Sequence, residues 1–226
     1  MCNRIQVKQA CNETPKLQNF FAMNKHVLIP IFLLLAFAGC RSGSEVTTQH
    51  YLLEMPAEYE FIWEGEPGPL PASCEVLGPD VVPAYSSHRI AVREESHQIR
   101  YFGFNEWAIR PDQVFHQMVV DFLKENRVFE ELAYGRVVIP ADYVLETEII
   151  HLEVDNRQEM FRARLHVEFR LRENETDKIL LTHREDRFET LDGRNLNDFA
   201  GAVSRMFTEE LAAFTESITG EVNRNQ

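Results

Sequence analysis

Three histidines, His151, His166 and His183, are the residues whose type and spacing come closest to a metal site. Each falls on one of three consecutive predicted strands, so the three rings could align across a sheet. However, the chain also carries 36 Asp and Glu residues, and histidines scattered among many carboxylates more often face solvent or form hydrogen bonds. We therefore expect no metal and no cofactor.

Catalytic motifs are missing from the sequence. It contains no Gly-x-Ser-x-Gly elbow, no Gly-x-x-x-x-Gly-Lys-Ser/Thr loop and no His-Glu-x-x-His pair. With 36 carboxylates, close pairs arise by chance, so no general acid and base can be singled out. We expect a protein that is not an enzyme, and an outer-membrane hydrolase is disfavoured for the same reason.

Net charge narrows the choice of partners. The 23 Lys and Arg residues against 36 Asp and Glu give a net charge of -13. No broad basic surface is available to neutralise phosphates, so nucleic acid is not expected as a partner, and a polybasic contact with anionic lipids is disfavoured.

Four arginines on the predicted strand 161–172 could form a docking patch for an acidic partner. They alternate with apolar residues, which predicts one buried and one wet face. The simpler interpretation is cross-strand pairing with glutamates of the strand before it, at about 0.2 to 1 kcal/mol per pair. We favour pairing. The arginines are Arg162, Arg164, Arg170 and Arg172, and the glutamates are Glu146, Glu148 and Glu153.

Aromatic residues in the irregular segment 83–107 are candidates for contact with a partner, because aromatic side chains dominate interface hot spots. We single out Tyr85, Tyr101 and Trp107. For Trp107, which directly precedes a predicted helix, a place in the core is an equally good interpretation.

The amino terminus has the pattern of a secretory signal. A twelve-residue apolar run, 27–38, follows Lys25 and His26 and ends in small residues, and it is well short of the ~20 residues that span a bilayer. Met23 would open a compact signal, so the true start is expected there and residues 1–39 are expected to be removed. The remaining 187 residues carry 19 positive and 35 negative groups.

The end of this signal, Leu35-Ala36-Phe37-Ala38-Gly39-Cys40, resembles the lipobox of bacterial lipoproteins, although Phe37 stands where Leu is usual. The resemblance implies that Cys40 carries fatty acyl chains, palmitate among them. Arg41 follows in place of the Asp associated with inner-membrane retention, which favours the periplasmic face of the outer membrane. Residues 40–49 would then be a tether, reaching at most ~30 Å.

The rest of the chain predicts one α+β domain over residues 50–220. Strands are expected at 50–55, 74–82, 89–93, 143–154, 161–172 and 178–188, and amphipathic helices from Pro111 and over 196–218. This order favours a single mostly antiparallel sheet with two helices packed on one face. Residues 57–73, rich in Glu, Gly and Pro, are expected to form a loop.

Several segments in this order resemble the ABC-type transport auxiliary lipoprotein family, which includes the paraquat-inducible C-like lipoproteins. They are Tyr51-Leu52-Leu53 shortly after the lipobox, 76–85, 89–93, Tyr101, Glu106-Trp107-Ala108 before Pro111, and Tyr143-Val144-Leu145-Glu146. The similarity covers nearly the whole mature chain. The sequence departs from the family's pattern in the acidic loop 57–73 and at Ser86-Ser87-His88.

The resemblance implies a lipoprotein without catalytic activity that works with an MCE (mammalian cell entry) protein, and often with an inner-membrane ABC transporter. Together they would move lipids or other hydrophobic molecules between the membranes. The protein would dock the outer-membrane end of that pathway. The sequence is compatible with a homo-oligomer. The alternative is a lipoprotein that regulates a cell-wall synthase or a secretion pore.

Overall fold

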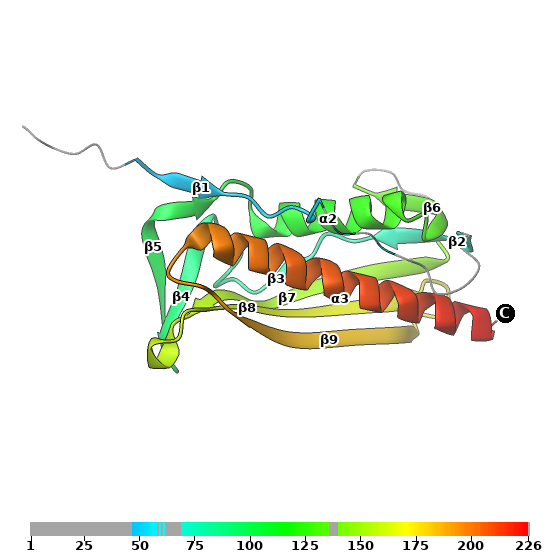
Figure 1. The fold of residues 1–226 in the computed structure, drawn as a ribbon. Helices are drawn as coiled ribbons and strands as arrows, with labels where there is room; N and C mark the ends of the chain where they lie inside the picture. The colour runs from blue at the N-terminus through cyan, green and yellow to red at the C-terminus, as the bar shows by residue number, and fades with distance from the viewer. Residues whose placement is uncertain (1–46, 58, 60, 62–68, 136–139, 226) are drawn as a thin grey trace, which may run out of the picture. The chain divides into compact units, whose positions relative to one another are not determined.

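A computed structural model describes residues 47–57, 59, 61, 69–135 and 140–225 (Figure 1). The predicted signal, Cys40 and most of the tether lie outside the described residues. Within the described part of the chain, no helix is both long and apolar enough to cross a membrane.

Over the described residues the domain is α+β, as predicted, with one nine-stranded sheet and two helices on one face (Figure 1). The strands are β1 (Gln49–Tyr51), β2 (Leu70–Val76), β3 (Asp80–Val81), β4 (Arg89–Glu95), β5 (Gln98–Trp107), β6 (Phe129–Tyr134), β7 (Tyr143–Asp155), β8 (Arg162–Glu173) and β9 (Ile179–Thr190). The helices are α2 (Pro111–Glu125) and α3 (Leu196–Asn225).

Strand β7 organises the sheet. Along one edge it pairs with β8, which pairs in turn with β9, and both of these long ladders are antiparallel. Along its other edge β7 pairs in succession with β2, β3 and β4, all of them parallel to it. Beyond these, β6 adds in parallel to β2, β5 is antiparallel to β4, and β1 is parallel to β5. The two longest ladders, β7–β8 and β8–β9, are therefore antiparallel. The ladders that β7 forms with β2, β3 and β4 are parallel.

The core lies between the sheet and the two helices. Helix α2 begins at Pro111, where a missing backbone N–H costs nothing, and it buries the predicted stripe of apolar residues. Phe169 of β8 lies with its ring 5.5 Å from that of Phe207 and 5.3 Å from that of Phe214, both on α3. Phe115 of α2 meets Phe207 at 4.5 Å, so aromatic contacts join both helices and the sheet.

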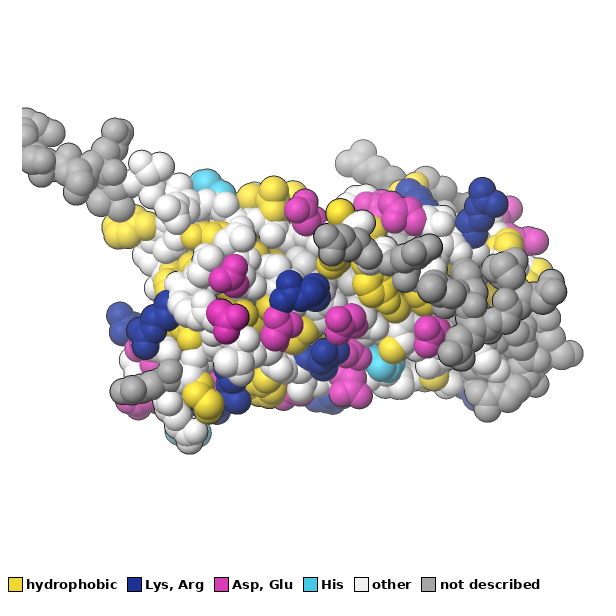
Figure 2. Space-filling model, viewed as in Figure 1, with side chains coloured by type: hydrophobic (Ala, Val, Ile, Leu, Met, Phe, Trp, Pro, Cys, Tyr) yellow, Lys and Arg dark blue, Asp and Glu magenta, His cyan; other side chains and the backbone are white. Residues whose placement is uncertain are grey.

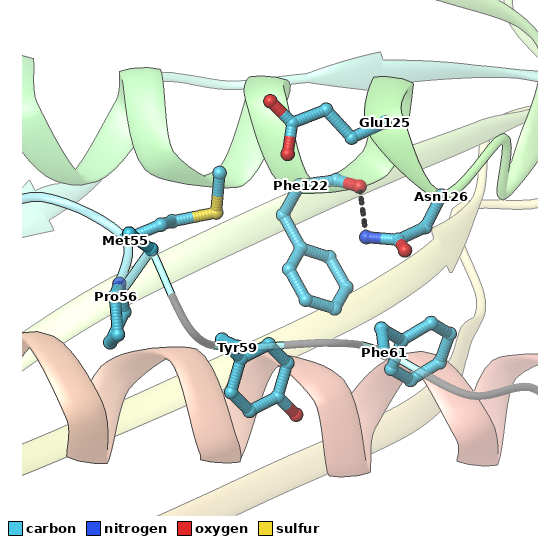
Figure 3. A pocket seen from close by; sticks show the side chains of 8 residues that line it. Met55, Pro56, Tyr59, Phe61, Phe122, Glu125 and Asn126 are labelled. Atoms are coloured by element: carbon cyan, nitrogen blue, oxygen red, sulfur yellow. Dashed lines mark hydrogen bonds between the residues drawn. The ribbon is translucent and has the colours of Figure 1, made fainter.

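Four expectations for the strands were wrong. The first strand ends at Tyr51, because the chain then leaves the sheet and places Met55, Tyr59 and Phe61 between α2 and α3 (Figure 3). The predicted strand 74–82 is divided into β2 and β3, and β2 begins at Leu70, inside the predicted loop 57–73. Strands β5 and β6 were missed: residues 101–104 of β5 do not alternate in polarity, and β6 carries a Glu-Glu pair at its centre.

Candidate docking surface

The face of the sheet opposite the helices, here called the open face, carries the polar side chains of β4, β7, β8 and β9. In parallel β4–β7 pairing, Ala91 lies opposite Glu153 and Arg93 opposite Asp155. The antiparallel β7–β8 pairing places Arg164 opposite Glu153. Because facing residues point to the same side of a sheet, these side chains gather on the open face.

Glu153 is the centre of a buried ionic cluster. Its side chain is 0% exposed, and its Oε1 accepts hydrogen bonds from Arg93 Nε at 2.7 Å and Arg164 Nη1 at 3.1 Å. The Tyr85 hydroxyl donates to Glu153 Oε2 at 2.7 Å and accepts from Arg93 Nη2 at 3.1 Å. Arg164 is also bidentate to Asp186, at 2.9 and 2.8 Å. The cluster thus joins β4, β7, β8, β9 and the β3–β4 loop.

The protonation states of this cluster are fixed by its contacts. Burial would raise the pKa of Glu153, but hydrogen bonds from Arg93 and Tyr85 outweigh burial and lower it. Burial and the bond to Glu153 raise the pKa of Tyr85, and the same carboxylate raises the pKa of Arg93. At neutral pH the carboxylate is charged and the phenol keeps its proton. The cluster therefore holds the strands together and offers no base poised to accept a proton.

Asp155, at the end of β7, anchors a second cluster. Arg157 Nε donates to it at 2.7 Å, and Arg162 of β8 forms a further ion pair. Burial would raise the pKa of Asp155, but the hydrogen bonds from these two arginines lower it to about 2. This carboxylate is therefore ionised throughout the physiological range.

The structure does not bring the three histidines together. His151 and His166 stack on the open face, with ring centroids 5.5 Å apart and their Nδ1 atoms 3.3 Å apart. His183 points to the opposite face, where its Nε2 lies 2.7 Å from Glu210 of α3. Among the described residues, no group of three or more His, Cys, Asp or Glu side chains is arranged to hold a metal ion.

The stacked histidines form a neutral hydrogen-bonded pair. Arg184 Nε donates to His166 Nε2 at 3.0 Å, so the proton of His166 sits on Nδ1 and is donated to His151. Burial is the main cause that lowers the pKa of both imidazoles. The two rings therefore use their hydrogen-bonding nitrogens on each other and on Arg184 rather than on a ligand.

The arginines of β8 pair with acidic neighbours, as predicted. Arg164 binds Glu153, Arg172 lies 3.3 Å from Glu146, and Arg162 binds Asp155. Arg170 lies 3.4 Å from Glu146 and 3.7 Å from Glu148. Between β9 and α3, ion pairs likewise join Arg187 to Glu209 and Arg205 to Glu189. The face seen in Figure 2 mixes basic and acidic side chains. The β8 arginines are thus not a free basic patch.

Of the three aromatic residues singled out in the sequence, two are buried. Tyr85 is 3% exposed within the Glu153 cluster, and Trp107 is 2% exposed and packs against Phe199 of α3, with ring centroids 5.6 Å apart. Tyr101 is half-buried on the open face: its hydroxyl donates to the Ala84 carbonyl at 3.1 Å, and the Arg89 guanidinium lies 3.9 Å from its ring centre. Tyr101 alone of the three presents a partly accessible ring.

Strand β5 carries the accessible aromatic surface. Phe104 is 55% exposed, and Phe102 is half-buried. Strand β1 pairs only with residues 105–107 of β5, and a large register shift separates the pair Arg89–Glu106 from the pair Ala91–Tyr101. Residues 98–104, here called the β5 edge, therefore have no partner strand on their outer side within the described part of the chain. Sequence reasoning placed this segment in the candidate region but missed Phe104.

A pocket of about 260 Å³ lies between α2 and α3 (Figure 3). Its described lining includes Met55, Tyr59, Phe61 and Phe122, together with Asn126, whose side-chain Nδ2 donates to the Phe122 carbonyl at 2.8 Å. Phe61 and Phe122 meet edge to face at 5.3 Å. These groups are suited to packing the segment after β1 between the helices.

Residues 51–214, from β1 into α3, match the family described as ABC-type transport auxiliary lipoprotein component. The chain belongs to this family. Its members are auxiliary lipoprotein components of transport.

Solved structures of other proteins share the fold, among them the following two. The crystal structure of protein XCC0632 from Xanthomonas campestris is 15% identical with a TM-score of 0.68, and the alignment covers 79% of this chain and 100% of that one. The crystal structure of an uncharacterized protein is 11% identical with a TM-score of 0.57, over 75% of this chain and 99% of that one. At such identities the likeness shows the fold alone. No curated protein matches the sequence.

Proposed function

We propose that this auxiliary lipoprotein is anchored through Cys40 to the periplasmic face of the outer membrane and docks an MCE-domain protein. With an inner-membrane ABC transporter, that partner would carry lipids between the membranes. Membership of the transport family supports an association with a transporter. The tether of at most ~30 Å supports docking of a partner that crosses the periplasm, because the domain cannot cross it.

The observation that carries the docking role is the β5 edge. Its outer backbone N–H and C=O groups are not used by a described strand, and such an edge is a template for a strand from another chain. Phe104 stands exposed on this strand, with Tyr101 and Phe102 half-buried beside it. A partner could therefore gain backbone hydrogen bonds and aromatic contacts from one short segment.

Buried neighbours give this edge its position. Trp107 fixes the end of β5 against α3, and its backbone N–H donates to the His88 carbonyl at 2.7 Å. Tyr85 fixes the β3–β4 loop to Glu153, and Tyr101 bonds to the same loop at Ala84. We therefore propose contact roles for Tyr101 and Phe104, and positioning roles for Tyr85 and Trp107.

Capture of the MCE protein by the purified lipoprotein tests this function. Phe104→Ala and Tyr101→Ala should each weaken capture, by roughly thirtyfold for a central interface aromatic. The matched control is Ile179→Ala, since Ile179 is 51% exposed at the start of β9, far along the sheet from β4 and β5. Circular dichroism should show that all three variants fold.

Two outcomes would contradict the proposal. Folded Phe104→Ala and Tyr101→Ala variants that capture as well as Ile179→Ala would remove the β5 edge from the interface. A wild-type lipoprotein that captures no MCE protein would reject the docking function, and it would favour regulation of a cell-wall synthase or a secretion pore.

A further inference from the structure

A mainly apolar groove of about 420 Å³ runs between the segment that follows β1 and the first turns of α2. Val114 and Met118 of α2 and Leu53 line it and are buried. Leu52 and Ile109 also line it but are 53% and 42% exposed. These two residues are neighbours, because the Ala108 N–H, one residue before Ile109, donates to the carbonyl of Tyr51, one residue before Leu52, at 2.8 Å.

The groove adjoins the point where the amino-terminal chain enters the domain. Leu52 follows directly on β1, and only twelve positions separate it from Cys40. At ~3.3 Å per extended residue, that stretch spans at most ~40 Å. A bilayer that holds acyl chains on Cys40 therefore lies within reach of Leu52 and Ile109. In Figure 2, hydrophobic side chains reach the surface near β1.

Charges at the rim of the groove select the kind of surface that fits. Glu54 and Asp121 both line it, and Asp121 accepts two hydrogen bonds from Gln117, at 2.7 and 2.8 Å. The nearby Arg110 is already bidentate to Asp112. An acidic rim repels anionic head groups, so the apolar side chains of this groove suit the interface of a zwitterionic bilayer, which carries no net charge.

We infer that Leu52 and Ile109 insert into the interface of the bilayer that holds the lipid anchor, so that the domain rests on the membrane at this groove. The inference rests on the anchoring part of the proposed function. It goes beyond that function, because a tether alone would leave the domain free to tumble. A second contact holds the domain in one orientation and limits the directions from which a partner can approach the β5 edge.

Nitroxide labels on the mature lipidated protein, which begins at Cys40 and so lacks Cys2 and Cys11, test the contact in phosphatidylcholine vesicles. Labels are placed at Leu52→Cys, Ile109→Cys and, as a matched exposed control, Ile179→Cys. The buried Cys74, which is 0% exposed, should not react. Collision of each label with oxygen, which partitions into lipid, is compared with collision with a water-soluble nickel chelate. Labels at positions 52 and 109 should collide several-fold less with nickel than the control and more with oxygen.

Each other outcome overturns the inference. Vesicles that carry the protein, with labels at 52 and 109 as open to nickel as the label at 179, would leave the anchor intact and reject the membrane contact. Protein that does not float with the vesicles would reject the anchor as well. Magnetic coupling between labels that disappears on dilution with unlabelled protein would assign the groove to a second copy of the chain.

Discussion

Replacing Glu153 by alanine should destabilise the domain by roughly 3 kcal/mol, the lower end of the range for removing one partner of a buried ion pair. The structure explains why the lower end applies. Arg164 keeps its bidentate contact with Asp186, so the loss falls on Arg93 and on the Tyr85 hydroxyl, which are left mostly buried with no carboxylate. Glu153→Gln keeps the shape and one acceptor oxygen, and it should cost less, about 1 to 3 kcal/mol.

Urea unfolding followed by circular dichroism measures this effect. With slopes of about 1 to 3 kcal/mol per molar urea, the midpoint for Glu153→Ala should fall by roughly 1 to 3 M with an unchanged slope. The matched control is Glu148→Ala on the same strand and face, where the nearest described cation, Arg170, lies 3.7 Å away and the pair is partly exposed. That change should cost less than about 1 kcal/mol. Equal midpoints for the two variants would refute the idea that Glu153 is the centre of the open face.

Three further predictions concern Asp155, Trp107 and Cys40. Because the folded-state pKa of Asp155 is lowered to about 2 from 3.8, the stability that this carboxylate contributes is present above pH 3.8 and is lost as the pH falls toward 2. Asp155→Asn should reduce this acid dependence in unfolding curves measured from pH 5 to 2. An unchanged dependence would reject the role of Asp155. Trp107→Ala should cost about 3 to 5 kcal/mol in urea unfolding, since it empties a core site against Phe199, and a cost below 1 kcal/mol would contradict that packing. Cys40→Ala should move the protein from the membrane to the soluble periplasmic fraction, whereas wild-type protein already found there unmodified would exclude the lipid anchor.

The elements that sequence patterns predicted best are those whose pattern is local. Strand β8 alternates apolar and charged residues throughout, and α3 repeats apolar residues at three and four, so each determines its own buried face. Pairing of the β8 arginines with the glutamates of β7 followed from the same alternation, because the two strands are joined by a short connection and must lie side by side.

The features that sequence patterns could not predict depend on contacts between distant segments. The parallel attachment of β2, β3 and β4 to one edge of β7 is set by pairings such as Cys74 with Tyr143, which no local pattern records. The Tyr85 hydroxyl is bound by Glu153 of β7 and Arg93 of β4, which lie 68 and 8 residues away from it in the sequence. Strand β5 was missed because its register shift breaks the alternation of exposed and buried residues.

Photo-crosslinking in living cells tests the docking of the MCE protein most directly. A photoreactive phenylalanine analogue is placed at Phe104, where the native side chain is 55% exposed, and at Ile179 as the control with similar exposure. We expect a covalent adduct with the MCE protein from position 104 and none from position 179. Adducts from position 179 alone, or no adduct with the MCE protein from position 104 of a folded and membrane-bound lipoprotein, would contradict it.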